Sequence, residues 1–174
     1  GVSVELMTTG WIGGTATINL TGNELGNELW GNDGVNQLHG GGGNVTDALF
    51  GFGGNDRLDG GAGLDLLVGG TGQDSFVFAN TLNSAEADII ADFSSADDTI
   101  LLDDAVFTGL SLGALNPNAF VTGTAALDAD DRILYDAATG KLYFDADGSG
   151  TTAAIQFATL SGNPPVSASD FMVF

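Results

Sequence analysis

The chain has 174 residues, with 23 acidic and 3 basic residues, a formal net charge of −20, one histidine and no cysteine. The absence of cysteine excludes disulfides, a catalytic thiol and thiolate metal sites, and a single histidine excludes a histidine-rich zinc or iron site. The charge argues against nucleic acid and an anionic membrane as partners and favours cations. No apolar run approaches the ~18 residues of a membrane span, so we expect no membrane insertion.

Residues 1–21 come before any regular pattern. Apolar residues alternate with polar ones at Val2, Val4 and Leu6, which predicts a strand. The chain begins without Met and without a basic or apolar leader, so we expect a piece of a longer protein and no N-terminal signal peptide. This segment is expected to be either an N-terminal cap or the tail of a preceding domain.

A nine-residue repeat fills residues 22–77, which hold 17 of the 28 glycines. The units are 22–30, 31–39, 40–50, 51–59, 60–68 and 69–77, and the third carries two extra residues, Val45-Thr46. Position eight is apolar in every unit: Leu29, Leu38, Leu49, Leu58, Leu67 and Phe76. Position six is an amide or an acid: Asn27, Asn36, Asp47, Asp56, Asp65 and Asp74. The last two units fit G-G-x-G-x-D-x-U-x, where U is a large apolar residue, a nonapeptide pattern of parallel β-helices.

The physical chemistry of this spacing predicts an all-β fold built as a parallel β-roll, a solenoid of two sheets. Glycine allows tight turns, and x-U-x forms a short strand with one side chain pointing inward. Two units make one coil, and units i and i+2 lie one strand spacing, about 4.8 Å, apart. Asp47 is therefore expected to stack on Asp65, and Asp56 on Asp74.

Stacked carboxylates predict a bound cation. At this spacing two of them repel by ~1 kcal/mol in water and by ~3–4 kcal/mol at an effective dielectric constant near 20. A cation between them turns the repulsion into attraction. A ligand set of carboxylate and carbonyl oxygens, without sulfur or imidazole, favours Ca²⁺, because Mg²⁺ prefers to keep its waters.

Residues 78–174 are expected to form an antiparallel β cap, because short apolar runs recur between turn signals. A hairpin is predicted between Ile133–Tyr135 and Lys141–Phe144, and a helical turn at Asn116–Ala119. Adjacent acids such as Asp97-Asp98 are expected in solvated turns. Residues Asp145–Gly150 begin like an EF-hand loop, but the twelfth position is Gln156 where that loop needs Glu. A plain turn is favoured, and calcium binding there is left open.

The repeats resemble the RTX, or hemolysin-type, calcium-binding modules at the C-termini of secreted bacterial proteins such as serralysin-type proteases, lipases and alginate epimerases. The resemblance implies several Ca²⁺ ions, each held between loops i and i+2. The first implied site joins Phe52, Gly54 and Asp56 with Gly69, Thr71 and Asp74. The second joins Gly41, Gly43 and Asp47 with Gly60, Ala62 and Asp65. The third joins Asn32, Gly34 and Asn36 with Gly51, Gly53 and Asp56. Half-sites at Gly61, Gly63, Gly70 and Gly72 would be completed by the following segment, with Asp92, one coil after Asp74, and Asp88 as candidates.

The same resemblance implies a secreted, extracellular module that folds on binding calcium. Residues 170–174, one acid followed by four apolar residues, resemble the C-terminal signal of type I secretion, although a closing strand has the same pattern. The implied partners are an ABC transporter, a membrane-fusion protein and an outer-membrane channel, together with a preceding domain. We find no catalytic constellation. The alternatives are the C-terminal part of a secreted hydrolase or polysaccharide-modifying enzyme, and a calcium-dependent adhesin or surface-layer protein.

Overall fold

Two facing sheets of short strands make up the molecule, and the predicted all-β fold is confirmed. The computed structural model describes residues 4–8 and 13–174, with side chains described from residue 13 onward. Among these residues the first sheet contains, in spatial order, β1 (Val4–Thr8), β3 (Gly26–Asn32), β5 (Ala48–Gly53), β7 (Leu66–Thr71), β9 (Asp88–Ile90), β15 (Ile155–Leu160), β14 (Lys141–Phe144), β13 (Ile133–Asp136) and β12 (Phe120–Thr122). The second contains β11 (Gly113–Ala114), β16 (Phe171–Val173), β10 (Thr99–Leu102), β8 (Ser75–Phe78), β6 (Arg57–Asp59), β4 (Asn36–His39) and β2 (Ile18–Thr21). Short 3₁₀ turns lie at η1 (Ser84–Glu86), η2 (Pro117–Ala119) and η3 (Ala168–Asp170).

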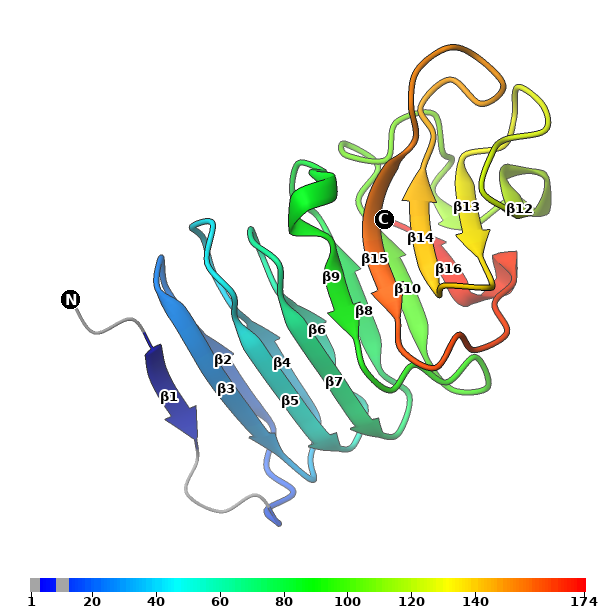
Figure 1. Cartoon of the computed structure of the whole chain (residues 1–174). Helices are drawn as coiled ribbons and strands as arrows, with labels where there is room; N and C mark the ends of the chain where they lie inside the picture. Colours follow the sequence, from blue (N-terminus) through cyan, green and yellow to red (C-terminus); the bar gives the residue numbers. More distant parts are fainter. Residues whose placement is uncertain (1–3, 9–12) are drawn as a thin grey trace.

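The repeat builds a parallel solenoid because each unit contributes one turn and one strand, alternately to the two sheets. Leu49 lies opposite Leu67 in the first sheet, and Leu58 lies opposite Phe76 in the second. These side chains point into the space between the sheets and are completely buried. Figure 1 shows the coils side by side, from β2 and β3 toward the C-terminal half. Burial of one large apolar residue per unit, about 1.5–3 kcal/mol each, holds the coils in register.

The parallel stack extends beyond residues 22–77 on both sides. β1 and β2 pair in parallel with β3 and β4, and β9 and β10 add one coil to β7 and β8. The added coil keeps the spacing of position six to position eight, as Asp88 to Ile90 and Asp98 to Ile100. Its turns are longer and poor in glycine, which hides them from a search for the nonapeptide.

The C-terminal half continues both sheets and is mixed in strand direction. The predicted hairpin is confirmed by the antiparallel pair β13 and β14, which β15 extends. The predicted helical turn is confirmed by η2. The expectation of purely antiparallel pairing does not hold, because β15 runs parallel to β9, β16 parallel to β10, and β12 parallel to β13. The edges of the last coil, β9 and β10, act as the template on which β15 and β16 are added in parallel.

A core of aromatic rings fills the space between the sheets in this half. Phe107 packs edge-on against Phe144 and Phe157, with ring centroids 5.1 Å apart in both pairs, and Phe78 packs in the same way against Phe157. The roll and the C-terminal half therefore share one continuous hydrophobic core. No helix in the described residues is long and apolar enough to cross a membrane.

Candidate metal sites between the coils

Two ladders of polar side chains run along the turns of the roll. The first ladder consists of Asn27, Asp47, Asp65 and Asp88, and the second of Asn36, Asp56, Asp74 and Asp98. In both, Oδ1 of each aspartate accepts the backbone N–H of the member one coil before it, at 2.6, 2.8 and 3.0 Å in the first ladder and 2.7, 2.8 and 3.0 Å in the second. Every member is at most 8% exposed. The predicted stacking of Asp47 on Asp65 and of Asp56 on Asp74 is confirmed.

The second carboxylate oxygen of four ladder members has no partner. Oδ2 of Asp47, Asp56, Asp65 and Asp74 is buried and accepts no hydrogen bond. Burial, with repulsion from neighbouring carboxylates added, raises the pKa of Asp56 to about 7 and the pKa values of Asp65 and Asp74 to about 6. A buried charge without a partner is strongly destabilising. Among the described residues, these four oxygens therefore have no hydrogen-bond donor to offset their burial.

Backbone carbonyls approach the unpaired oxygens at the first residue of the third and fourth units, Gly40 and Gly51. A Cβ on Gly51 would lie 2.3 Å from Asp56 Oδ2 and 2.5 Å from Gly69 O. A Cβ on Gly40 would lie 2.6 Å from Asp47 Oδ2 and 2.3 Å from Gly60 O. Because these glycines have no side chain, the aspartate of the same unit and the backbone carbonyl of the glycine two units later both face one small space. Oxygen ligands of these two kinds suit Ca²⁺.

The first implied site is brought together by the fold. Gly70 lies against the carbonyl of Phe52, and Gly72 lies against that of Gly54. A Cβ on Gly70 would be 2.0 Å from the Phe52 oxygen, and a Cβ on Gly72 would be 1.8 Å from the Gly54 oxygen. Phe52 has a φ of 78°, a left-handed conformation that is unusual for a bulky residue, and it turns this carbonyl toward the next coil. Thr71 O accepts the N–H of Gly54 at 2.9 Å.

The second implied site is changed by the two-residue insertion. Gly61 faces Gly41 O, as expected, but Gly63 faces Val45 O, and the corresponding Cβ–O distances would be 1.9 and 2.1 Å. Gly43 instead lies beside Glu24 O. The carbonyl assigned to Gly43 is therefore replaced by that of Val45. The sequence places the insertion at Val45-Thr46 but gives no signal that the Val45 carbonyl takes this position.

The third implied site has a different chemistry, because position six of its earlier loop is an amide. Asn36 Oδ1 accepts the N–H of Asn32 at 2.7 Å, and Asn36 Nδ2 donates to Asn32 Oδ1 at 3.1 Å and to Gly34 O. The amide nitrogen thus donates to oxygens of two residues, Asn32 and Gly34, that the resemblance assigns to an ion. Gly51 and Gly53 lie in the later loop, where Gly53 faces Thr71 Oγ1 and Asp33.

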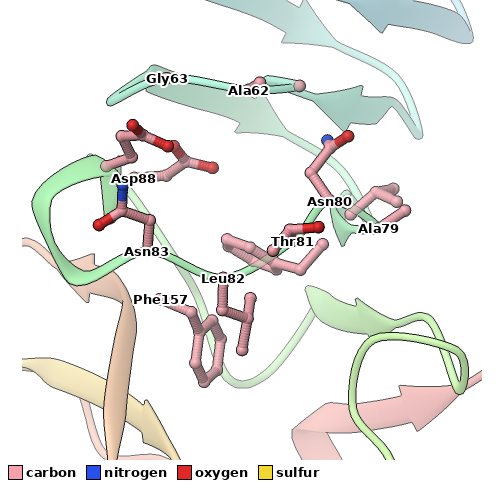
Figure 2. A pocket seen from close by; sticks show the side chains of 13 residues that line it. Ala62, Gly63, Ala79, Asn80, Thr81, Leu82, Asn83, Asp88 and Phe157 are labelled. Atoms are coloured by element: carbon pink, nitrogen blue, oxygen red, sulfur yellow. The ribbon is translucent and has the colours of Figure 1, made fainter. Parts of the chain in front are cut away.

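The half-site at Gly61 and Gly63 is covered by the segment that follows β8. These glycines line a cavity of about 30 Å³ together with Ala62 and Asp88. Figure 2 shows Asp88 on one side of this cavity and Asn80 on the other, beneath the turn between β6 and β7 that carries Ala62 and Gly63. Burial, with repulsion from the other carboxylates, raises the pKa of Asp88 to about 8.

Two acids lie at the half-site of Gly70 and Gly72, the predicted Asp92 and, in the ladder, Asp98. Asp98, not Asp92, is the ladder member above Asp74. Asp92 instead accepts the N–H groups of Gly69 and Gly70 at 3.0 and 2.8 Å. Asp98 is 8% exposed, so the expectation of a solvated turn at Asp97-Asp98 is wrong for this residue. Its spacing to Ile100, position six to position eight, is the signal that could have found it.

The EF-hand-like loop is closed by its own hydrogen bonds. Asp147 Oδ2 accepts the N–H groups of Thr151 and Thr152 at 3.0 and 3.1 Å. Gln156 does not close the loop, because its Nε2 donates to Thr159 Oγ1 and its backbone N–H donates to the hydroxyl of Ser84.

Among the described residues, no three acidic or histidine side chains gather into a group that could hold a metal by themselves. A metal ion bound between the coils would therefore need backbone carbonyls among its ligands.

Comparison with known families decides the identity of this repeat. Residues 6–173 match the model of the family described as Peptidase M10 serralysin C terminal. The chain belongs to the serralysin C-terminal family. The match covers the roll and the C-terminal half together, which agrees with the continuous core of this serralysin C-terminal module. None of the curated proteins matches the chain.

A solved structure supports the same assignment. The serralysin C-terminal module is similar to the R3 subunit of mannuronan C5-epimerase AlgE6 from Azotobacter vinelandii, with a TM-score of 0.56 and 27% sequence identity. The similarity covers 91% of this chain and 80% of the epimerase subunit. The resemblance to an RTX C-terminal module, drawn from the repeats alone, is confirmed.

Proposed function

We propose that the chain is a calcium-binding RTX module of a secreted protein, with Ca²⁺ ions held between successive coils. The observation that supports this most strongly is the set of four buried aspartate oxygens without a hydrogen bond, each beside a glycine-lined turn. Calcium would supply the positive charge that these oxygens lack. The bound ions would be ligated by the carboxylates of Asp47, Asp56, Asp65 and Asp74 and by turn carbonyls.

Calcium binding would switch folding on outside the cell. Each site adds RT ln(1 + [Ca²⁺]/Kd) to the stability, or ~1.4 kcal/mol when Kd is ten times below the ambient concentration. Three to five coupled sites then supply ~4–7 kcal/mol, which is comparable with the whole stability of a small domain. At the low free calcium inside a bacterium the carboxylates repel, and the open chain can pass through a secretion channel.

We also propose that the module itself carries no catalysis and serves type I export of a larger protein. Its C-terminal residues would act as the signal read by the ABC transporter, membrane-fusion protein and outer-membrane channel. The family takes its name from a peptidase, and the solved relative is a subunit of an epimerase. Both names favour a parent enzyme whose catalytic domain precedes this chain.

Circular dichroism of the chain during a calcium titration tests the proposed function. The spectrum in EGTA is expected to show reduced sheet signal and a lowered unfolding midpoint, and the sheet signal is expected to rise cooperatively as calcium reaches millimolar levels. Magnesium at the same concentration is expected to have little effect, because it keeps its hydration waters. A sheet spectrum in EGTA that calcium leaves unchanged would contradict the folding switch.

A further inference from the structure

The asparagines at position six of the first two units differ from the aspartates that follow them. Asn27 and Asn36 are as deeply buried as the aspartates, with 2% and 0% exposure. Within the described part of the chain, the buried oxygens without a partner include four ladder aspartates but neither asparagine. Within the six repeat units, position six is therefore satisfied when it is an amide and unsatisfied when it is an acid.

The hydrogen bonds of Asn36 give the reason. Its Oδ1 points at Gly31, where a Cβ would be 2.1 Å away, just as Asp56 Oδ2 points at Gly51. In the asparagine turn this oxygen accepts the N–H of Asn32 at 2.7 Å. The amide nitrogen donates to Asn32 Oδ1 and to Gly34 O. Two N–H bonds from one neutral side chain thus reach two oxygens of the turn.

The first unit repeats this arrangement. Asn27 Oδ1 points at Gly22 and accepts the N–H of Asn23 at 2.7 Å, and Asn27 Nδ2 lies 3.5 Å from Asn23 Oδ1. The backbone N–H of each asparagine donates to the aspartate one coil later. Its side-chain nitrogen cannot accept a hydrogen bond in turn, so each ladder begins at its asparagine. Both ladders are closed at the N-terminal end without a charge.

We propose that the amide groups of Asn27 and Asn36 take the place of a cation, so that the first coil of the roll closes without calcium. The calcium-dependent gaps then begin where position six becomes aspartate. The inference rests on the proposed function and departs from the third ion that the family resemblance implies. On this proposal, the residue at position six decides whether a turn depends on calcium: aspartate makes it dependent, and asparagine makes it independent.

Replacing Asn36 by aspartate would turn the closed gap into a cation site. The new carboxylate would keep one oxygen on the N–H of Asn32 and bring the other against Asn32 Oδ1 and Gly34 O. Three oxygens would then converge without a proton between them, which is the arrangement that Ca²⁺ ligation requires. The variant is therefore expected to gain an ion and to need it.

Calorimetric calcium titration and thermal unfolding of Asn36→Asp test the proposal on the whole chain. The variant is expected to bind one more ion per chain than wild type. Its unfolding midpoint should fall in EGTA and recover in millimolar calcium. The matched control is Asn118→Asp, which adds the same charge at an exposed position of η2 and should change neither the stoichiometry nor the calcium dependence.

The converse variant, Asp56→Asn, keeps the test decisive if Asn36→Asp folds poorly. It places an amide beside Gly69 O and is expected to bind one ion fewer and to unfold at a higher temperature than wild type in EGTA. Calcium binding by wild type, with unchanged stoichiometry in Asp56→Asn, would overturn this inference alone. A wild-type chain that binds no calcium would overturn the proposed function as well.

Discussion

At the scale of the residue, glycine decides where the coils can approach. Gly61 has a φ of 93° and faces the backbone carbonyl of Gly41, whereas a Cβ on Gly42 would meet no atom within 4 Å. The two glycines lie in successive loops of the same ladder but differ in what a methyl group would contact. Position 61 needs glycine both for its left-handed backbone conformation and for its close approach to the Gly41 carbonyl, whereas position 42 needs it for neither reason.

Gly61→Ala is therefore expected to destabilise the calcium-loaded chain by at least about 1–3 kcal/mol, the cost of a strained left-handed residue. Gly42→Ala is the matched control and is expected to stay within about 0.5 kcal/mol of wild type. Urea unfolding in saturating calcium measures both. Equal stability of the two variants would contradict the role given to the turn at Gly61.

At the scale of the element, the final strand β16 is an interior part of the second sheet. It lies between β10 and β11, and its alternation places Phe171 in the core at 1% exposure and Met172 outside at 46%. Phe171 packs against Phe120 with ring centroids 5.7 Å apart. The residues proposed as the export signal are thus ordered and partly buried once the chain folds.

Phe171→Ala is expected to cost about 3–5 kcal/mol, because a buried ring leaves a cavity behind. Met172→Ala removes a side chain of similar length from the solvent side of the same strand and is expected to cost less than about 0.5 kcal/mol. Thermal unfolding in calcium compares the two. A small effect of Phe171→Ala would mean that β16 is not part of the folded core.

The elements also show how far the sequence predicts this fold and its candidate sites. The period of nine predicts the two sheets, their register and the stacked aspartates, because each unit repeats one turn and one strand. It misses Asp98, since the steps from Asp74 to Asp88 and from Asp88 to Asp98 are 14 and 10 residues instead of nine. It misses Val45, since an insertion moves the carbonyl that faces Gly63. The strand directions of the C-terminal half depend on the edges offered by the last coil, which no local pattern encodes.

At the scale of the whole molecule, the buried carboxylates are expected to make stability depend on pH in opposite ways with and without calcium. The folded-state pKa values of Asp56, Asp65 and Asp88 are raised to about 7, 6 and 8 by burial, from an ordinary value of 3.8. Without calcium the folded chain therefore holds more protons than the unfolded chain between about pH 4 and pH 8. The stability of the metal-free chain must fall as pH rises through this range.

We expect the unfolding midpoint in EGTA to be higher at pH 5 than at pH 8. In calcium the order should reverse, because protons compete with the ion for the same carboxylates. Thermal scans at the two pH values, each with EGTA and with millimolar calcium, measure both trends. Parallel pH dependence in the two conditions would argue that these carboxylates bind no metal.

The most direct measurement of calcium between the coils is X-ray diffraction from crystals grown in saturating calcium, with anomalous data collected at long wavelength. We predict anomalous peaks beside Oδ2 of Asp47, Asp56, Asp65 and Asp74, and none inside the turns closed by Asn27 and Asn36. Gaps that hold only water beside all four aspartates under these conditions would contradict the calcium-binding function.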